Sequence, residues 1–118
     1  MGTSGVGRFS DYSRSTEIDK CDEIIKNELL ESYGDYDYSK KSLVIPSVDT
    51  KIHIEVRERI IVVDTIGNSI GALSTEYEYI RECMQVRGYS FNGQIDSSDN
   101  ASGVVSIRVT LIGTKNKK

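Results

Sequence analysis

The sequence predicts an α+β domain, in which a small antiparallel β-barrel or strongly curved sheet carries one well-predicted helix over residues 75–87. Two observations indicate this fold class. Several short segments alternate apolar and polar residues, as strands with one buried face do. Among these segments, only residues 75–87 combine helix-forming residues with clear start and stop signals. Short strands with one such helix fit a curved sheet or partly open barrel that the helix covers on one side.

The middle of the chain predicts three consecutive strands. Apolar and polar residues alternate along 51–57, whereas the continuous β-branched centre of 59–64 is typical of a strand covered on both faces. Gly67 and Asn68 tolerate the positive φ that a tight reversal needs, and the apolar segment 70–73 follows them. We therefore expect a hairpin whose second strand is short.

The helix expected over 75–87 has signals at both ends. Ser74 and Thr75 are both N-cap residue types, and Glu78 follows Thr75 at the spacing of a capping box. Gly88 comes directly after the segment, and glycine is the residue that most often ends a helix. The chain should therefore pass from the hairpin straight into a helix.

The C-terminal part predicts two further strands joined by a polar loop. Apolar and polar residues alternate over 89–95, where Gly93 is a candidate for a bulge, and they alternate most regularly over 105–111. Residues 97–103 are Ser, Asp, Asn and Gly with one Ala, a composition typical of loops. Gly113 should end the last strand.

Residues 16–33 allow two interpretations, an N-terminal helix or a strand. The apolar doublets at 24–25 and 29–30 fit a bent strand, since periodicity does not assign short apolar runs. A helix is favoured by apolar residues near helical spacing and by a capping signature at Thr16 and Asp19. The apolar residues concerned are Ile18, Cys21, Ile25 and Leu29. We favour the helix and keep the strand as the alternative.

The 118 residues suffice for one domain with a single core. We assign 1–15 to a Gly/Ser-rich N-terminal arm, 16–113 to one β-barrel-like domain, and 114–118 to a basic tail. Phe9 and Tyr12 are the aromatic anchors of the arm if it docks on a surface. Without such a surface, its composition is that of a solvated tail.

A run of core positions within residues 60–95 is similar to a known family. A β-branched strand, a turn, an Ile-Gly-x-Leu strand, a helix and a Gly-Tyr entry to the next strand follow in this order. The residues that carry the pattern are Val62, Val63, Ile70, Gly71, Leu73, Ile80, Gly88 and Tyr89. Over about a third of its length, the chain thus resembles the second half of HIRAN-type small barrels. This resemblance implies a non-catalytic module that binds single-stranded DNA ends beside helicase or nuclease domains.

Residues with catalytic chemistry are few and separated. His53, the single histidine, lies on the polar face of strand 51–57, where we expect it to be solvated or paired across strands. Cys83 falls on the packed side of the helix, where a thiol behaves as a small apolar group. Asp35 and Asp37 have the chemistry of cation ligands, but we expect an exposed loop or edge strand there. We predict a protein without enzymatic activity, metal, cofactor or small-molecule substrate.

Cys21 and Cys83 lie far apart and have neither metal-binding nor redox spacing. This favours reduced thiols and hence a cytoplasmic protein. No segment approaches the roughly 20 apolar residues of a membrane span, and none near Met1 resembles the apolar core of a signal peptide. We therefore expect a soluble cytoplasmic protein without a membrane partner.

Surface residues indicate partners of two kinds. For a protein partner or self-association, the candidates are aromatic residues of the acidic N-terminal half, because Tyr is enriched in interfaces. They are Phe9, Tyr12, Tyr36 and Tyr38; alternatively, these tyrosines cover the barrel with their hydroxyls in water. For a nucleic acid, the candidates are the arginines that can contact phosphates. They are Arg57, Arg59, Arg81, Arg87 and Arg108.

We therefore predict a non-enzymatic adaptor or assembly subunit that works through protein–protein contacts. The first alternative is a HIRAN-like module that binds single-stranded DNA. The second is an accessory subunit that completes the site of a partner enzyme. Residues 51–118 hold nine Lys and Arg against eight Asp and Glu, a balance of +1, whereas phosphate-binding proteins usually have a plainly basic face. The charge therefore favours the protein partner.

Overall fold

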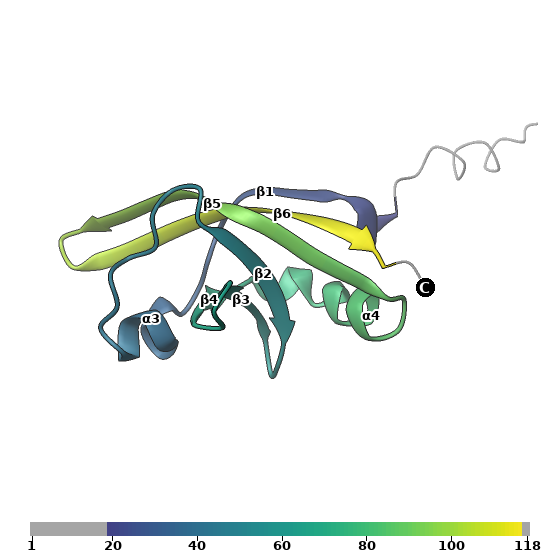
Figure 1. Cartoon of the computed structure of the whole chain (residues 1–118), viewed down its shortest axis with the longest axis horizontal. Coiled ribbons are helices and arrows are strands. Elements are labelled where there is room, and N and C mark those ends of the chain that lie inside the picture. Colours follow the sequence, from purple (N-terminus) through teal and green to yellow (C-terminus); the bar gives the residue numbers. More distant parts are fainter. Residues whose placement is uncertain (1–18, 117–118) are drawn as a thin grey trace, which may run out of the picture.

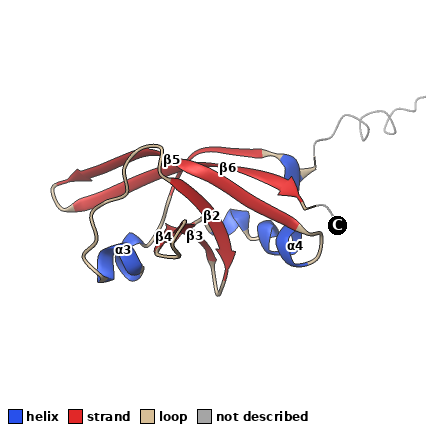
Figure 2. Cartoon of the chain, in the orientation of Figure 1, coloured by secondary structure: helices blue, strands red, loops and turns tan. Residues whose placement is uncertain are grey.

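The computed structural model describes residues 19–116, which form one six-stranded antiparallel sheet curled into a half-barrel (Figure 1). The strand order is β1-β6-β5-β2-β3-β4, and the helical elements are short (Figure 2). The predicted α+β class is confirmed. The strands are β1 (Ile24–Leu29), β2 (Lys51–Val56), β3 (Ile60–Asp64), β4 (Ser69–Ala72), β5 (Tyr89–Ala101) and β6 (Val104–Lys115). The helical elements are η1 (Lys20–Asp22), η2 (Tyr33–Asp35), α3 (Asp37–Lys40), η3 (Thr75–Tyr77) and α4 (Tyr79–Gln85), where η marks a 3-10 helix.

The two edges of the sheet meet at one point. β1 and β4 are the edge strands, yet Glu31 pairs with Ala72 of β4 through two backbone hydrogen bonds of 2.8 and 2.9 Å. The neighbouring Leu30 donates its N–H to the carbonyl of Ile107 in β6. Because the backbone of these two residues bridges β6 and β4, the sheet curls around its core instead of lying open.

A single main core fills the half-barrel. The alternation predicted for β2 is confirmed, since Ile52 and Ile54 are buried while their polar neighbours are not. α4 covers this core with Ile80 and Cys83. Burial of one large apolar side chain contributes roughly 1.5–3 kcal/mol, so this cluster is the main source of stability. Its largest fully buried members are Ile60, Ile70, Leu73, Ile80, Phe91, Ile95, Ile107 and Leu111.

β3 is covered on both faces, as its continuous β-branched sequence predicts. Val62 belongs to the main core, whereas Ile61 and Val63 form a second, smaller cluster with Ala72 of β4. Tyr36, between η2 and α3, packs against this second cluster. The segment that follows β1 therefore forms a second layer over the outside of β3.

The helix predicted over 75–87 is observed as η3 followed by α4. The side chain of Ser74 accepts a hydrogen bond of 3.2 Å from the Glu76 N–H and so caps η3 in place of the predicted capping box. Gly88 follows the helix with a φ of 77°. Glycine is favoured here because this left-handed conformation strains other residues.

The loop predicted over 97–103 is wrong, because most of this segment is strand. β5 continues to Ala101 and β6 begins at Val104, so the turn contains only Ser102 and Gly103. Both turn residues have positive φ, 56° and 82°, as a tight two-residue hairpin turn requires. Alternation did not reveal this strand because the tip of the hairpin is exposed and buries neither face.

The bulge predicted at Gly93 lies further along β5, between Ile95 and Ser97. Gly93 serves a different purpose. A Cβ atom there would lie 1.8 Å from the carbonyl oxygen of Thr110, so only glycine permits the close approach of β5 and β6. Gly113 does not end β6 as predicted, since the strand continues for two more residues.

The helix favoured for residues 16–33 is wrong over the described part of that range, which contains η1, β1 and the start of η2. The buried residues Cys21, Ile25 and Leu30 are four and five positions apart, which imitates helical spacing. The cause is a register shift in β1, where Asn27 has a φ of 51° and adds a residue to the strand. The strand alternative was correct.

Candidate interaction surfaces

The side chains considered for catalysis lie apart from one another. His53 is half-exposed on β2, with its Nε2 atom 3.9 Å from a carboxylate oxygen of Glu55. It pairs with Val63 on one side and Asn92 on the other. Within residues 19–116, no three His, Cys, Asp or Glu side chains are placed to hold a metal ion.

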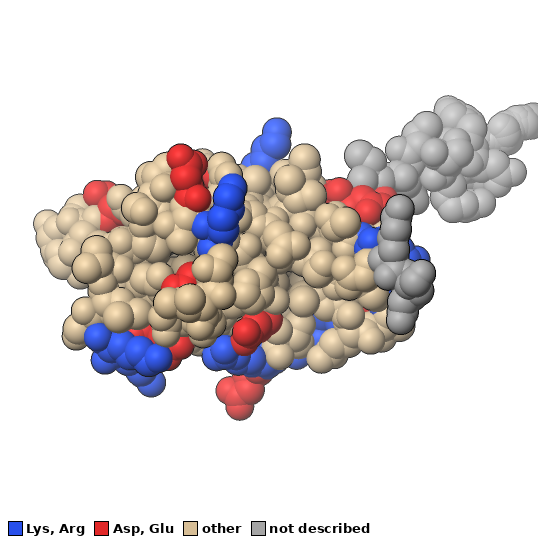
Figure 3. All heavy atoms as spheres, viewed as in Figure 1, with Lys and Arg blue, Asp and Glu red and all other residues tan. Residues whose placement is uncertain are grey.

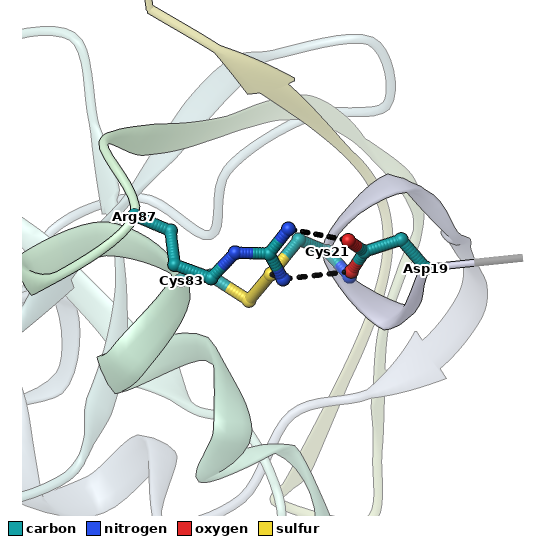
Figure 4. The surroundings of a disulfide bond; sticks show 4 residues. All are labelled: Asp19, Cys21, Cys83 and Arg87. Atoms are coloured by element: carbon teal, nitrogen blue, oxygen red, sulfur yellow. Dashed lines mark hydrogen bonds and ion pairs between the residues drawn. A yellow bond between two sulfur atoms is a disulfide. The ribbon is translucent and has the colours of Figure 1, made fainter.

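Cys21 and Cys83 form a disulfide, so the prediction of reduced thiols is wrong (Figure 4). η1 packs against β6 near Gly113, and α4 covers the same end of the core, which brings the two Cα atoms within 5.8 Å. The cysteines are 62 positions apart in sequence. No spacing motif indicates this pair, because its proximity depends on the pairing of β1 with β6.

An ion pair lies beside the disulfide (Figure 4). The guanidinium of Arg87 donates to both carboxylate oxygens of Asp19, with an Nη1–Oδ1 distance of 2.9 Å, and Nη1 is also 3.1 Å from the Cys21 sulfur. The hydrogen bond from Arg87, together with one from the Cys21 N–H, lowers the pKa of Asp19 to about 2. The same contact raises the pKa of Arg87. A covalent and an ionic link thus join the start of β1 to the end of α4.

The five arginines predicted to contact nucleic acid are each bonded within the protein. Their partners are Glu55 for Arg57, Glu31 for Arg59, Glu78 for Arg81, Asp19 for Arg87, and the Asn27 carbonyl for Arg108. Arg57, Arg59 and Arg81 meet at the β2–β3 turn, where Arg81 also donates to two turn carbonyls. Arg87 and Arg108 lie elsewhere, beyond α4 and on β6. The structure therefore brings three of the five together.

Tyr38 belongs to a polar network that we call the Asp64 network, formed by Asp37, Tyr38, Asp64 and Ser69. The Tyr38 hydroxyl donates to Asp64 Oδ2 at 2.6 Å. Asp64 Oδ1 accepts from two backbone N–H groups of the β3–β4 turn at 2.9 and 3.0 Å. Asp37 and Ser69 exchange two hydrogen bonds of 3.0 and 2.9 Å. These bonds hold α3 on the β3–β4 hairpin.

The pKa values in the Asp64 network follow from these bonds. Burial alone would raise the pKa of Asp64, but the hydrogen bonds from Tyr38 and the turn outweigh it, so the pKa is lowered. The backbone hydrogen bond from Ser69 lowers the pKa of Asp37. Burial and the bond to Asp64 raise the pKa of Tyr38 to about 12. The Tyr38 hydroxyl is therefore a neutral donor, engaged within the protein.

Tyr36 lies in a different setting, at a cleft that we call the Tyr36 cleft. It encloses about 580 Å³ and is open to solvent. Ile61 and the Tyr36 ring give it an apolar floor. Figure 3 shows charged side chains of both signs over α3 and over the β2–β3 turn, which lie near the two sides of the cleft. The charged lining residues are Asp35, Arg57, Glu58 and Arg59.

A second surface lies on the outside of the sheet, where β1 pairs with β6. Ile24 and Ile112 are direct cross-strand partners and are 51% and 47% exposed. Leu29, 42% exposed, lies opposite Arg108 further along the same pair of strands. Direct partners in antiparallel strands share a face, so Ile24 and Ile112 form one apolar contact area. We call these three apolar residues the outer patch.

The sequence contains a signal for the outer patch in its apolar doublets. Ile24 and Ile112 each precede or follow a buried apolar residue, in the doublets 24–25 and 111–112. In a strand, adjacent residues face opposite sides, so an apolar doublet places one of its members on the solvent side. The predicted anchors Phe9 and Tyr12 lie outside the described residues.

Comparisons with known proteins give no relative from which a function could be taken. No family model, no curated protein and no solved structure matches the chain. Among residues 19–116, no helix is long and apolar enough to cross a membrane. The surfaces described above are therefore the basis for assigning a function.

Proposed function

We propose that this protein is a non-enzymatic assembly subunit, and that two copies associate through the outer patch on β1 and β6. The observation that carries this proposal is the pair Ile24 and Ile112, two large apolar side chains that lie side by side and about half exposed. Burial of apolar surface is the main favourable contribution to most protein–protein association. A second copy of the same face would supply the matching apolar surface.

The surroundings of the outer patch favour docking of this kind. Across the sheet, Ile112 is followed by Asn92 of β5, and the next cross-strand pair is Thr110 with Gln94. Asn92, Thr110 and Gln94 are polar but uncharged, and removing them from water costs less than removing charges does. The charged neighbours, Asp96 and Arg108, are bonded to Thr110 and to the Asn27 carbonyl. The centre of a stable interface is typically depleted of charged residues.

The free edge of β1 is a weaker candidate for the contact than its outer face. The register shift at Asn27 interrupts the strand, and bulges of this kind protect sheet edges from pairing with another chain. The Asn27 N–H donates to Thr110 Oγ1, and its carbonyl accepts from Arg108. These backbone groups are therefore directed to β6, and packing of faces is favoured over strand addition.

The two alternative functions receive less support. A HIRAN-like role in binding single-stranded DNA would use arginines that already have partners within the protein, so phosphates would have to compete with Glu31, Glu55, Glu78 and Asp19. No feature of the described residues specifically supports an accessory role at the site of a partner enzyme. Both remain predictions from the sequence.

The disulfide changes the cellular compartment that we expect for the protein. Reduced cysteines would indicate the cytoplasm, whereas the structure has a disulfide between Cys21 and Cys83. Disulfides persist mainly in oxidising compartments. We therefore propose that the protein works in an oxidising environment.

Light scattering on purified protein tests the proposed association. The Ile112→Lys variant should be monomeric at concentrations where the natural chain is a dimer, because each contact would bury two uncompensated charges. Ile66→Lys is the matched control, since Ile66 is 81% exposed and lies in the β3–β4 turn, away from the outer patch. A natural chain that stays monomeric, or an Ile112→Lys variant that associates as strongly as the natural chain, would refute the proposal.

A further inference from the structure

The Tyr36 cleft has unbalanced charges. Arg57 is held by Glu55, with an Nη2–Oε1 distance of 2.5 Å, and Arg59 is held by Glu31 at 2.7 Å and by the Leu73 carbonyl at 2.7 Å. Asp35 and Glu58 form no ion pair with any other described residue. Because both arginines are already neutralised, the cleft presents an excess of two negative charges around an apolar floor.

The N-terminal arm has the complementary sequence. Residues 8–14 read Arg-Phe-Ser-Asp-Tyr-Ser-Arg, so a positive charge stands at each end. The two aromatic side chains stand between them, on either side of Asp11, which leaves the segment a net charge of +1. Phe9 and Tyr12 match the apolar floor of Ile61 and the Tyr36 ring, and aromatic residues are typical anchors of an interface. Arg8 and Arg14 match the two unpaired carboxylates.

We propose that the Tyr36 cleft binds residues 8–14 of a second copy of this chain. Phe9 and Tyr12 lie over Tyr36 and Ile61, and Arg8 and Arg14 pair with Asp35 and Glu58. This names a segment and a receptor site for self-assembly, and it rests on the assembly role proposed above, although it uses a different surface from the outer patch.

The position of the arm favours a second copy over the same chain. The start of β1, which Asp19 and η1 precede, lies at the end of the sheet that is away from α3 (Figure 1). The six residues of β1 alone span about 20 Å between these ends. The seven residues from Asp19 to Tyr12 reach at most about 25 Å when fully extended. Docking on its own cleft would therefore need an almost fully stretched arm, whereas a second copy imposes no such restraint.

The proposal predicts the symmetry of the contact. An arm that docks in the cleft of the next copy forms a head-to-tail contact between two different surfaces. An open row of copies then keeps one free arm at one end and one free cleft at the other until a ring closes. By contrast, the outer patches of two copies contact each other around a two-fold axis, and this assembly is complete as a dimer.

Sedimentation velocity of mixed variants tests the proposal, with every chain carrying Ile112→Lys so that the outer patch cannot contribute. The arm variant combines Phe9→Ser with Tyr12→Ser, and the cleft variant combines Asp35→Lys with Glu58→Lys. Each variant alone should associate at least tenfold more weakly than the Ile112→Lys parent. An equal mixture should form heterodimers, because the intact arm of one variant meets the intact cleft of the other.

The control for the charge change is Glu76→Lys with Asp99→Lys, which has the same net charge on exposed positions elsewhere and should associate like the parent. A parent that is monomeric at every concentration would overturn the arm proposal and leave the outer patch untouched. A mixture that forms no heterodimer would also overturn it. If the Ile112→Lys parent associates as strongly as the natural chain, the outer patch is not the dimer contact. The arm proposal then stands or falls with the heterodimers in the equal mixture.

Discussion

The two ends of the half-barrel are fastened by different chemistry. At one end, η1 is joined to α4 by the Cys21–Cys83 disulfide and by the ion pair of Asp19 with Arg87. At the other end, α3 is held on the β3–β4 hairpin by the Asp64 network, which contains no covalent link. Each device ties a segment with little regular structure to the central sheet.

The difference shows how short segments with little apolar surface are fixed. η1 buries one residue, and neither η2 nor α3 buries any. At the α3 end, Tyr33, Tyr36 and Tyr38 pack against the core without being fully buried, so apolar burial there is partial and specific bonds add to it. The covalent link should be insensitive to pH and sensitive to reductant, whereas the Asp64 network should show the opposite behaviour.

Loss of the disulfide should have the largest effect. The cysteines are 62 positions apart, and opening a loop of that size should lower the free energy of unfolding by about 4 kcal/mol through the entropy of the unfolded chain. Urea unfolding of the natural chain should show this decrease when a reductant is added. The Cys21→Ala, Cys83→Ala double variant should show the same decrease without reductant. Equal midpoints with and without reductant would mean that the bond contributes nothing.

Removal of the central carboxylate should have the next largest effect. Asp64→Ala leaves the Tyr38 hydroxyl and two turn N–H groups without their acceptor, at a cost of about 3 kcal/mol in total. Tyr38→Phe removes one bond and should cost about 1 kcal/mol. Asp99→Ala is the exposed control and should change nothing. An Asp64→Ala variant as stable as this control would show that the network is dispensable.

Acid should loosen the Asp64 end before the disulfide end. The pKa values of Asp64 and Asp37 are lowered in the folded protein, so their contribution is complete above the unfolded value of about 4 and is lost as the pH falls through the folded values. The protection factors of α3 amides against hydrogen exchange should fall below about pH 4, while amides of α4 remain protected by the covalent link. A simultaneous loss of protection at both ends would contradict this order.

The smallest effect should come from Arg87→Gln. Both partners of this ion pair are more than a third exposed, so solvent and salt screen the attraction, and the disulfide keeps η1 in place. The thermal midpoint of the oxidised protein should therefore change less than in Tyr38→Phe. After reduction, the same substitution should matter more, because the ion pair is then the remaining link.

The sequence allowed prediction wherever local patterns decide the structure. The alternation of β2, the β-branched centre of β3 and the cap at Ser74 each act over a few residues, and each was predicted. The hairpin tip at Ser102 was missed because it is exposed and buries neither face. β1 was predicted only as the alternative to a helix, because its pairing with β6 joins residues far apart in sequence. The disulfide and the exposure of Ile112 depend on the same long-range register. Tyr36 and Tyr38 were singled out together, and only the fold separates the open cleft beside Tyr36 from the engaged hydroxyl of Tyr38.

The central claim, that two copies meet through the outer patch, is tested most directly by nuclear Overhauser effects between differently labelled copies. In an equal mixture of isotope-labelled and unlabelled protein, filtered spectra should show contacts between the methyl groups of Ile24 and Ile112 in different copies. Control methyl groups of Ile66, which lies outside the patch, should show none. A dimer whose intermolecular contacts omit Ile24 and Ile112 would contradict the account.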